Sequence, residues 1–442
     1  MICGVLAARS AGRFCDLHVY RAGGQDVLSG TPLNQVNYAG YLPFTYPPAA
    51  ALVFTLFAVL PWTAAATLMT AASVIALPAV LYFALRLPPV SSWLDRGTAA
   101  RLAFVAAAAA LWLEPVRTTL AYGQVNILLA LLITWDLSRP EGARLKGVAL
   151  GLAAGIKLTP AIFVVYLLVT RRYRAAAVAA GTFAATIGAA FATGPSSAVW
   201  YWTGAFLDTG RVSTGPHQAL TINQSLLGML TRVLHTPRVP AGWLAVVVLA
   251  GLAGLALAAR AGQAGNEAAG FSLTAITGLL ISPVSWTHHW VIAIPALLLV
   301  GVTAWHQFGS RRPAALAWLA ALAAVAVVGW TGIVRHTPSS ATPLHFLLGN
   351  SYVLIAVAAL AIAARPLVSA RRGPRPGAGA PTGQPEPSLA PAGRLFRPQL
   401  GEPVSSVPMA PAAPRAPHPM APSARGTATR WRHRHVARVS PC

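Results

Sequence analysis

Asp16 is the side chain of this sequence best placed to take a proton in a reaction. It opens residues 16–20 (DLHVY), upstream of a Gly-rich polar stretch and of Tyr46, after which long apolar segments begin. A carboxylate at such a boundary is partly desolvated, which raises its pKa and suits it to be a general base. We therefore predict that Asp16 is catalytic and that Tyr20 and Tyr46 bind substrate. Asp26 is the rival carboxylate.

Two adjacent histidines, His288 and His289, are the second candidate for chemistry. They begin an apolar segment and are flanked by Trp286 and Trp290. No cysteine or carboxylate lies nearby at the spacing of metal ligands, so we expect no metal there. The pair suits hydrogen bonding to a phosphate. The alternative is that the two rings only cap or pack a helix.

Lys157 is a single positive charge inside the apolar residues 155–160 (GIKLTP). A lysine at membrane depth costs about 2.5–3.5 kcal/mol on insertion scales, so it is usually paired or functional. Binding a lipid-linked phosphate would offset this cost. The alternative is that the side chain extends to a nearby interface.

Amide side chains form two further polar groups. Gln124 and Asn126 precede an apolar segment, where the unpaired N–H groups of a helix start suit an anion or a sugar hydroxyl. Ordinary helix entry with amide bonding between helices is the alternative. Asn223 and Gln224 lie in a second polar segment, which also matches a glycosylation sequon. We predict that all four bind substrate.

Membrane helices must position these side chains. Of the 442 residues, 55% are hydrophobic and only 10% charged, and the mean hydropathy is +0.59. A helix needs about 20 apolar residues to cross the hydrocarbon, and the alternation of a membrane barrel is absent. We therefore predict an all-α polytopic membrane domain over residues 48–365. Its segments are 48–85, 101–114, 123–138, 145–170, 175–193, 240–259, 269–284, 286–306, 314–333 and 350–365.

Basic loops orient the segments, because loops rich in arginine and lysine stay in the cytoplasm. Such loops surround Arg96, Arg144, Arg172, Arg260 and Arg312. The remaining loops, which carry most of the candidate site residues, then converge on the outer side, as expected of a site. For this topology to close, the segment 145–170 must enter and leave on the cytoplasmic side as two short helices or a re-entrant hairpin. The first segment should be split at Pro61.

The two ends of the chain differ from this membrane domain. Residues 366–442 are rich in proline and arginine and poor in large apolar residues, which predicts a disordered cytoplasmic tail. The tail contributes much of the net charge of +23, and we assign that charge to anionic lipid headgroups, not to nucleic acid. Residues 1–47 are predicted to be an outer catalytic loop region. We expect a further helix upstream of Met1 to carry them across the membrane.

In their order, these motifs resemble the polyprenol-phosphate-mannose-dependent α-mannosyltransferases of glycosyltransferase family 87, which have the multi-spanning GT-C architecture. The sequence lacks the P-loop, the dinucleotide fingerprint and the Asp-x-Asp pair of soluble nucleotide-sugar enzymes. The resemblance extends from residue 16 to about 365. The matching segments are 16–20, 46–61, 123–126, 155–160, 223–226 and 282–289.

The resemblance implies a mannosyl donor on a polyprenyl phosphate and a lipid-anchored mannoside or glycan of the bacterial envelope as acceptor. The reaction would take place on the outer side of the plasma membrane, with inversion and without a cofactor. Asp16 would take the proton of the acceptor hydroxyl. His288, His289 and Lys157 would offset the charge of the departing phosphate.

Two alternatives remain open at the level of sequence. An arabinofuranosyltransferase that uses polyprenyl-phosphate arabinose belongs to the same family. A transporter or lipid flippase would also have many helices with internal polar residues. Transporters often consist of two related halves, and no internal repeat is visible here. The large predicted outer loops also favour an enzyme.

Overall fold

The computed structural model describes residues 14–34, 42–212, 219–236, 242–308, 312–337 and 342–371. Over these residues the chain is helical, and the one strand-like pairing they contain is the isolated bridge between Asn223 and Trp286. The predicted all-α class is therefore confirmed. The predictions made for the first 13 residues and for most of the tail fall outside the described residues.

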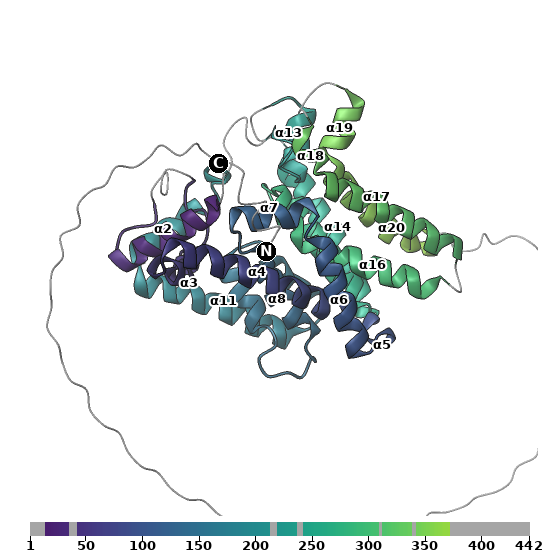
Figure 1. The fold of residues 1–442 in the computed structure, drawn as a ribbon, viewed down its shortest axis with the longest axis horizontal. Coiled ribbons are helices and arrows are strands. Elements are labelled where there is room, and N and C mark those ends of the chain that lie inside the picture. The colour runs from purple at the N-terminus through teal and green to yellow at the C-terminus, as the bar shows by residue number, and fades with distance from the viewer. Residues whose placement is uncertain are drawn as a thin grey trace, which may run out of the picture. The chain divides into compact units, whose positions relative to one another are not determined.

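The elements follow one another as short and long helices (Figure 1). They are α2 (Cys15–Ser29), α3 (Pro48–Val59), α4 (Trp62–Leu85), α5 (Val90–Trp93), α6 (Arg96–Ala110), α7 (Glu114–Tyr122), α8 (Asn126–Ser138), α9 (Val148–Ile156), α10 (Ala161–Val169), α11 (Tyr173–Thr193), α12 (Pro195–Trp200), the π-helix η1 (Tyr201–Ala205), the 3-10 turn η2 (Thr209–Arg211), α13 (Leu226–Val233), α14 (Trp243–Gln263), α15 (Glu267–Ile281), the 3-10 helix η4 (Thr287–Ala293), α16 (Ile294–Gln307), α17 (Arg312–Thr331), α18 (Ile333–His336), α19 (Pro343–Gly349) and α20 (Ser351–Arg371).

Four described helices are long and apolar enough to cross a membrane: α4, α11, α14 and the continuous η4–α16. Two sharply bent pairs, α6 with α7 and α19 with α20, raise the number within the described residues to as many as six. Shorter apolar helices, among them α3, α8 and α15, accompany them. Each predicted membrane segment coincides with one or more of these helices. The prediction of a polytopic membrane protein is confirmed.

The break predicted at Pro61 is also confirmed. Helix α3 begins at Pro48 and ends at Val59, and α4 begins at Trp62. Proline can begin a helix because the N–H group it lacks would have no partner in the first turn. The two prolines therefore define the two ends of α3.

The segment from residue 15 to 29 is a helix, where the sequence predicted a polar loop. Two glycines, Gly23 and Gly24, suggested a loop, but in α2 they allow close packing against the next helix. A Cβ atom on Gly23 would lie 2.6 Å from the ring of Phe44, and one on Gly24 would lie 2.6 Å from the carbonyl oxygen of Phe54. Tight tertiary packing thus outweighs the low helix propensity of glycine. Asp16 consequently lies in the first turn of a packed helix.

The segment 145–170 folds back on itself, as the topology required. Glu141 Oε1 pairs with Lys146 Nζ at 2.8 Å, just before α9, and with Arg172 Nη1 at 3.3 Å, just after α10. Both ends of the α9–α10 pair therefore lie at the same end of the molecule. The break between the two helices contains Lys157. The hairpin prediction is confirmed, with Lys157 at the tip.

Small residues let the hairpin lie close to α11. A Cβ atom on Gly151 would collide with the carbonyl oxygen of Ala179, and one on Gly155 would collide with the side chain of Thr186. Glycine stripes of this kind allow membrane helices to approach closely. The position of the hairpin tip is thus fixed by backbone contact along α9.

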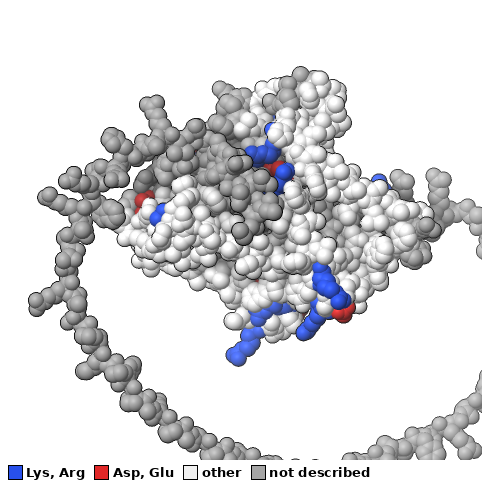
Figure 2. Space-filling view, in the orientation of Figure 1, with Lys and Arg blue, Asp and Glu red and all other residues white. Residues whose placement is uncertain are grey.

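Figure 2 shows charged side chains along the lower edge of the visible surface and a second, smaller charged group in its upper middle, whereas much of the rest of that face is uncharged. The ion pairs of Glu141 with Lys146 and Arg172 belong to the basic loops on either side of the hairpin. Such a distribution is expected of a protein whose middle faces lipid and whose basic loops face one compartment.

Candidate active site

Asp16 lies beside a cluster of two tyrosines and a glutamine. The hydroxyl oxygens of Tyr20 and Tyr46 are 2.6 Å apart, and each hydroxyl lies within hydrogen-bonding distance of Gln124 Oε1, at 2.8 and 3.0 Å. Because the amide oxygen faces the tyrosines, the amide nitrogen is left to donate, and Gln124 hydrogen-bonds Asp16. Three segments, α2, the residues just before α3 and the turn before α8, thus meet at this carboxylate.

Burial raises the pKa of Asp16 to about 6. The Gln124 hydrogen bond, the positive charge of Lys157 and the Cys15 thiol act in the opposite direction and limit the rise. The side chain is partly exposed, and α2 lies outside the candidate membrane spans. A carboxylate with this pKa is largely ionised at neutral pH and still basic enough to take a proton from a hydroxyl.

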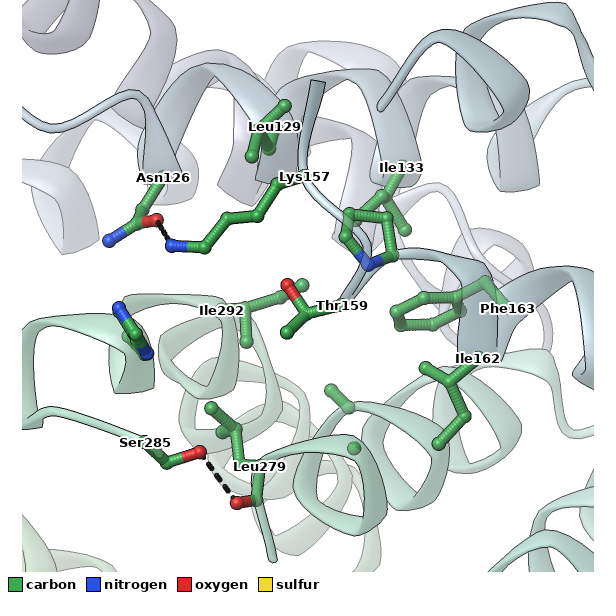
Figure 3. A pocket seen from close by; sticks show the side chains of 14 residues that line it. Asn126, Leu129, Ile133, Lys157, Thr159, Ile162, Phe163, Leu279, Ser285 and Ile292 are labelled. Atoms are coloured by element: carbon green, nitrogen blue, oxygen red, sulfur yellow. Dashed lines mark hydrogen bonds between the residues drawn. The ribbon is translucent and has the colours of Figure 1, made fainter. Parts of the chain in front are cut away.

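Lys157 connects this cluster to the next. Its Nζ atom donates a hydrogen bond to Asn126 Oδ1 at 2.9 Å and lies 5.5 Å from the centre of the Tyr46 ring (Figure 3). Its backbone is extended between α9 and α10, because α9 ends at Ile156 and Pro160 precedes α10. The hairpin therefore carries its positive charge toward Asp16.

The two histidines follow on the other side of Asn126. The carbonyl oxygen of His288 accepts hydrogen bonds from Asn126 Nδ2 at 3.2 Å and from Thr119 Oγ1 at 3.1 Å. The rings of His288 and His289 meet edge to face, with centroids 4.6 Å apart. The backbone of the histidine segment is thus fixed at His288, and the ring of His289 makes its own hydrogen bond to the backbone of Val284.

The histidines have different surroundings. His289 is partly exposed and lines a cleft. His288 is buried against Tyr122, with ring centroids 5.3 Å apart, and its Nε2 atom has no hydrogen-bond partner among the described residues. His289 is therefore the member of the pair that a ligand in the cleft can reach directly.

The cleft is open to its surroundings, and its cavity volume is about 50 Å³. Figure 3 shows Asn126 and Lys157 at one end and Ile162 and Phe163 at the other. Its polar lining consists of Asn126, Lys157, Thr159, Ser285 and His289. Its apolar lining consists of Leu129, Ile133, Pro160, Ile162, Phe163, Ala275, Gly278, Leu279 and Ile292. A site with one cationic, hydrogen-bonding end and one hydrocarbon end suits an anionic amphiphile.

Asn223 and Gln224 lie outside this lining and hold the loop that precedes the histidines. Asn223 Oδ1 accepts a hydrogen bond from the backbone N–H of Ser285 at 3.0 Å. Gln224 donates to the carbonyl oxygen of Gly349 at 2.6 Å, and its side-chain oxygen accepts from the backbone N–H of Tyr352 at 3.2 Å. The side-chain amides of both residues thus form hydrogen bonds with backbone groups of neighbouring segments.

Sequence reasoning did not single out three polar side chains that the structure brings to this region. Ser285 and Thr159 line the cleft, and both belong to motifs that were noticed for a neighbouring histidine or lysine. The third is Glu114, which is buried beside the histidine segment. Asp26, the rival carboxylate, is ten positions after Asp16 in α2 and so about 15 Å along the helix axis. No group of three or more potential metal ligands occurs in the described parts of the chain.

Sequence comparison places the chain in a known family. The model of glycosyltransferase family 87 matches residues 44–283. A polyprenol-phosphate-mannose-dependent alpha-(1-2)-phosphatidylinositol mannoside mannosyltransferase of Mycobacterium tuberculosis is 34% identical over 371 residues, which cover 79% of this chain and 84% of that protein. The chain belongs to glycosyltransferase family 87. It is therefore a glycosyltransferase, and the transporter or flippase alternative is wrong.

Two more similarities accompany this result. A polyprenol-phosphate-mannose-dependent alpha-(1-2)-phosphatidylinositol pentamannoside mannosyltransferase of the same species is 37% identical over 304 residues, 66% of this chain and 67% of that protein. The solved structure of ArnT from Cupriavidus metallidurans bound to undecaprenyl phosphate aligns with a TM-score of 0.42 and 17% identity, covering 84% of this chain and 71% of that chain.

The matched range of family 87 contains part of the site. It includes Tyr46, Gln124 and Lys157, whereas Asp16 and His289 lie beyond its two ends. In the folded chain these residues meet all the same, because α2 packs on α3 and the η4 helix packs on α7 and α8. The candidate site of this glycosyltransferase therefore includes residues on both sides of the range that the family model matches.

Proposed function

We propose that this glycosyltransferase moves a mannosyl group from polyprenyl-phosphate mannose to a lipid-anchored mannoside, on the outer side of a bacterial plasma membrane. The observation that carries the proposal is the continuity of the base Asp16 with the amphiphilic cleft through Gln124, Lys157 and Asn126. Relatives that cover most of the chain are named for the same donor and for phosphatidylinositol mannoside acceptors.

The donor would lie along the cleft. Its phosphate would occupy the polar end, near Lys157 and His289, and the first isoprene units would lie against Ile162 and Phe163. Burial of those units removes apolar surface from water or loosely packed lipid, and the phosphate balances the lysine charge. The sugar would then project from the phosphate toward Asp16.

The transfer would occur in one displacement. The acceptor hydroxyl oxygen forms a bond to the anomeric carbon while the bond from that carbon to the phosphate oxygen breaks. Asp16 takes the proton of the hydroxyl, and polyprenyl phosphate leaves with the electron pair. Lys157 and His289 offset the charge that grows on the leaving phosphate. The attack from the face opposite the phosphate inverts the anomeric configuration.

In this proposal, the charges of the loops determine on which side of the membrane the site lies. The hairpin ends at the ion pairs of Glu141 with Lys146 and Arg172, which belong to loops rich in arginine. Such loops remain in the cytoplasm. Lys157 lies at the opposite, tip end of the hairpin, and so the site would open to the outer leaflet.

The test uses purified protein in lipid nanodiscs. Polyprenyl-phosphate mannose, polyprenyl-phosphate arabinose and GDP-mannose, each with a labelled sugar, are offered with phosphatidylinositol mannoside as the acceptor. The proposal predicts transfer from the first donor and formation of an α-linked product. Transfer only from the arabinose donor would contradict the sugar assignment, and transfer only from GDP-mannose would contradict the lipid-linked donor.

A further inference from the structure

Glu114 is a buried carboxylate to which the reaction above gives no task. The residue is 3% exposed and begins α7. Its Oε1 atom accepts hydrogen bonds from Thr118 at 2.8 Å, from Thr287 at 2.8 Å and from Arg335 at 3.3 Å. Its Oε2 atom lies 3.3 Å from the hydroxyl of Tyr352. A buried carboxylate needs such donors, because without them its desolvation would be strongly unfavourable.

These donors come from distant parts of the chain. Thr287 begins η4, Arg335 lies in α18 and Tyr352 lies in α20. Glu114 therefore ties four elements together at one point, next to the candidate site. Glu114 is buried among these donors and is not part of the cleft lining, so we do not assign it the role of a second base.

Two routes lead from Glu114 to the histidine pair. The first is through the chain, because Thr287 directly precedes His288, and its backbone N–H donates to the carbonyl oxygen of Ile222 at 2.9 Å. Thr287 is thus fixed at both its side chain and its backbone. Because Thr287 is the first residue of η4 and the two histidines follow it directly, these contacts fix the start of the histidine segment.

The second route is through side chains. Arg335 donates to Glu114 with one nitrogen and to the hydroxyl of Tyr122 with another, at 3.1 Å. The ring of Tyr122 in turn packs edge to face against His288. His288 therefore touches a tyrosine whose position depends on the same carboxylate.

We propose that Glu114 is a positioning residue, which holds Thr287 and Arg335 so that His289 faces the polar end of the cleft. This inference deepens the proposed function and rests on it, since it assigns to Glu114 the orientation of the group that contacts the donor phosphate. Glu114 acts through the histidine segment and does not touch either substrate.

Three substitutions separate positioning from general stability. Glu114→Gln keeps the shape of the side chain but loses the charge that Arg335 faces. Thr287→Val removes only the hydroxyl that reaches Glu114, and Thr287→Ser keeps it. Glu267→Gln is the matched control, because Glu267 is also a buried carboxylate with an arginine and a tyrosine partner, Arg172 and Tyr166, at the hairpin ends.

The kinetic result expected is a rise of about tenfold in the apparent KM for the lipid-linked donor in Glu114→Gln and Thr287→Val. The apparent KM for the acceptor should stay within twofold. Thr287→Ser should restore donor use, and Glu267→Gln should leave both constants unchanged. Equal effects on donor and acceptor, or a similar effect of Glu267→Gln, would overturn the proposal.

A second readout does not depend on turnover. Diethyl pyrocarbonate modifies accessible histidine rings, and mass spectrometry of the peptide that contains His289 gives the rate. We expect this rate to change at least threefold in Glu114→Gln and Thr287→Val, and to match the wild type in Thr287→Ser and Glu267→Gln. Unchanged labelling would overturn the proposal even if the donor KM rises.

The two readouts also separate this inference from the function on which it rests. If wild-type protein fails to use any polyprenyl-phosphate sugar, the proposed function is wrong, and the labelling rates still decide whether Glu114 orients the histidines. If Glu114→Gln does not fold, as judged by size-exclusion chromatography in detergent, the valine and serine variants of Thr287 decide the question.

Discussion

Lys157 donates a hydrogen bond from Nζ to Oδ1 of Asn126 at 2.9 Å, and this contact joins the tip of the α9–α10 hairpin to the first residue of α8. The other end of the same amide donates to the carbonyl oxygen of His288. The side chain of Asn126 therefore hydrogen-bonds both Lys157 and the backbone of the histidine segment, and so it fixes the position of one relative to the other. Two positively charged or hydrogen-bonding groups are held at the same end of the cleft, where a phosphate would need them.

The pKa of Asp16 gives the first prediction, a pH dependence of transfer. Its pKa is raised to about 6, so the carboxylate is protonated and inactive well below this pH and ionised above it. The value of kcat/KM should therefore rise with pH through about 6 and then level off. The measurement is kcat/KM from pH 4.5 to 8 in nanodiscs, with recovery at pH 7.5 after each exposure as the control for unfolding.

Gln124→Leu should move this rising limb to higher pH. The Gln124 hydrogen bond lowers the pKa of Asp16, so its loss raises that pKa further. Gln263→Leu is the matched control, since Gln263, the last residue of α14, donates its side-chain hydrogen bond to the backbone oxygen of Val169 at the end of α10. A limb that stays in place in Gln124→Leu would show that another group controls the pH dependence.

Lys157→Met should lower kcat by about 10²–10³-fold, because it removes a positive charge from the developing phosphate anion. The same change should raise the pKa of Asp16, which the lysine charge lowers. Lys157→Arg keeps the charge and should retain part of the rate. The check is single-turnover transfer at pH 8, where Asp16 is ionised in all three proteins. Equal transfer rates for Lys157→Met and the wild-type protein would contradict the role of Lys157 in stabilising the leaving phosphate.

The two histidines should respond differently to alanine. His289→Ala should raise the apparent donor KM by about tenfold, since His289 lines the cleft. His288→Ala should mainly lower the melting temperature, since it leaves a cavity beside Tyr122. His306→Ala, an exposed histidine stacked on Trp93, is the control and should change neither quantity. A reversal of the two effects would exchange the roles assigned here.

Gly151→Ala should destabilise the protein by about 1–3 kcal/mol, because the new methyl group meets the backbone of α11. Gly181→Ala, a glycine of α11 with open space around it, should be neutral or slightly stabilising. Thermal unfolding in detergent, followed by intrinsic tryptophan fluorescence, compares the two. Equal melting temperatures for the two variants would mean that the stability of the protein does not depend on close contact between α9 and α11.

Much of the architecture could be predicted from the sequence, because three of its features are local. The length of an apolar segment predicts a membrane helix, proline predicts a helix end, and basic loops predict the topology. Pro61 predicted the break between α3 and α4, and the basic loops required the segment 145–170 to enter and leave on one side. Helix α2 was missed, because Gly23 and Gly24 indicate a loop until the ring of Phe44 and the backbone of Phe54 are brought against them. Close packing of that kind has no local signal.

The site was predictable residue by residue but not as an arrangement. Asp16, Tyr20, Tyr46 and Gln124 were chosen separately, and only the fold brings the two hydroxyls to one amide oxygen. Glu114 had no local signal, because its donors lie as far as 238 positions away in the chain. Nor could sequence separate His288 from His289, whose different exposure depends on Tyr122.

The most direct test of the central claim is single-turnover transfer by Asp16→Asn, measured with saturating polyprenyl-phosphate mannose and acceptor. The amide keeps the size of the carboxylate but cannot take the proton, so the rate should fall by about 10²–10⁴-fold while binding of polyprenyl phosphate stays near that of the wild type. Asp26→Asn, in the same helix, should transfer at the wild-type rate. Transfer by Asp16→Asn at the wild-type rate would contradict the assignment of Asp16 as the base.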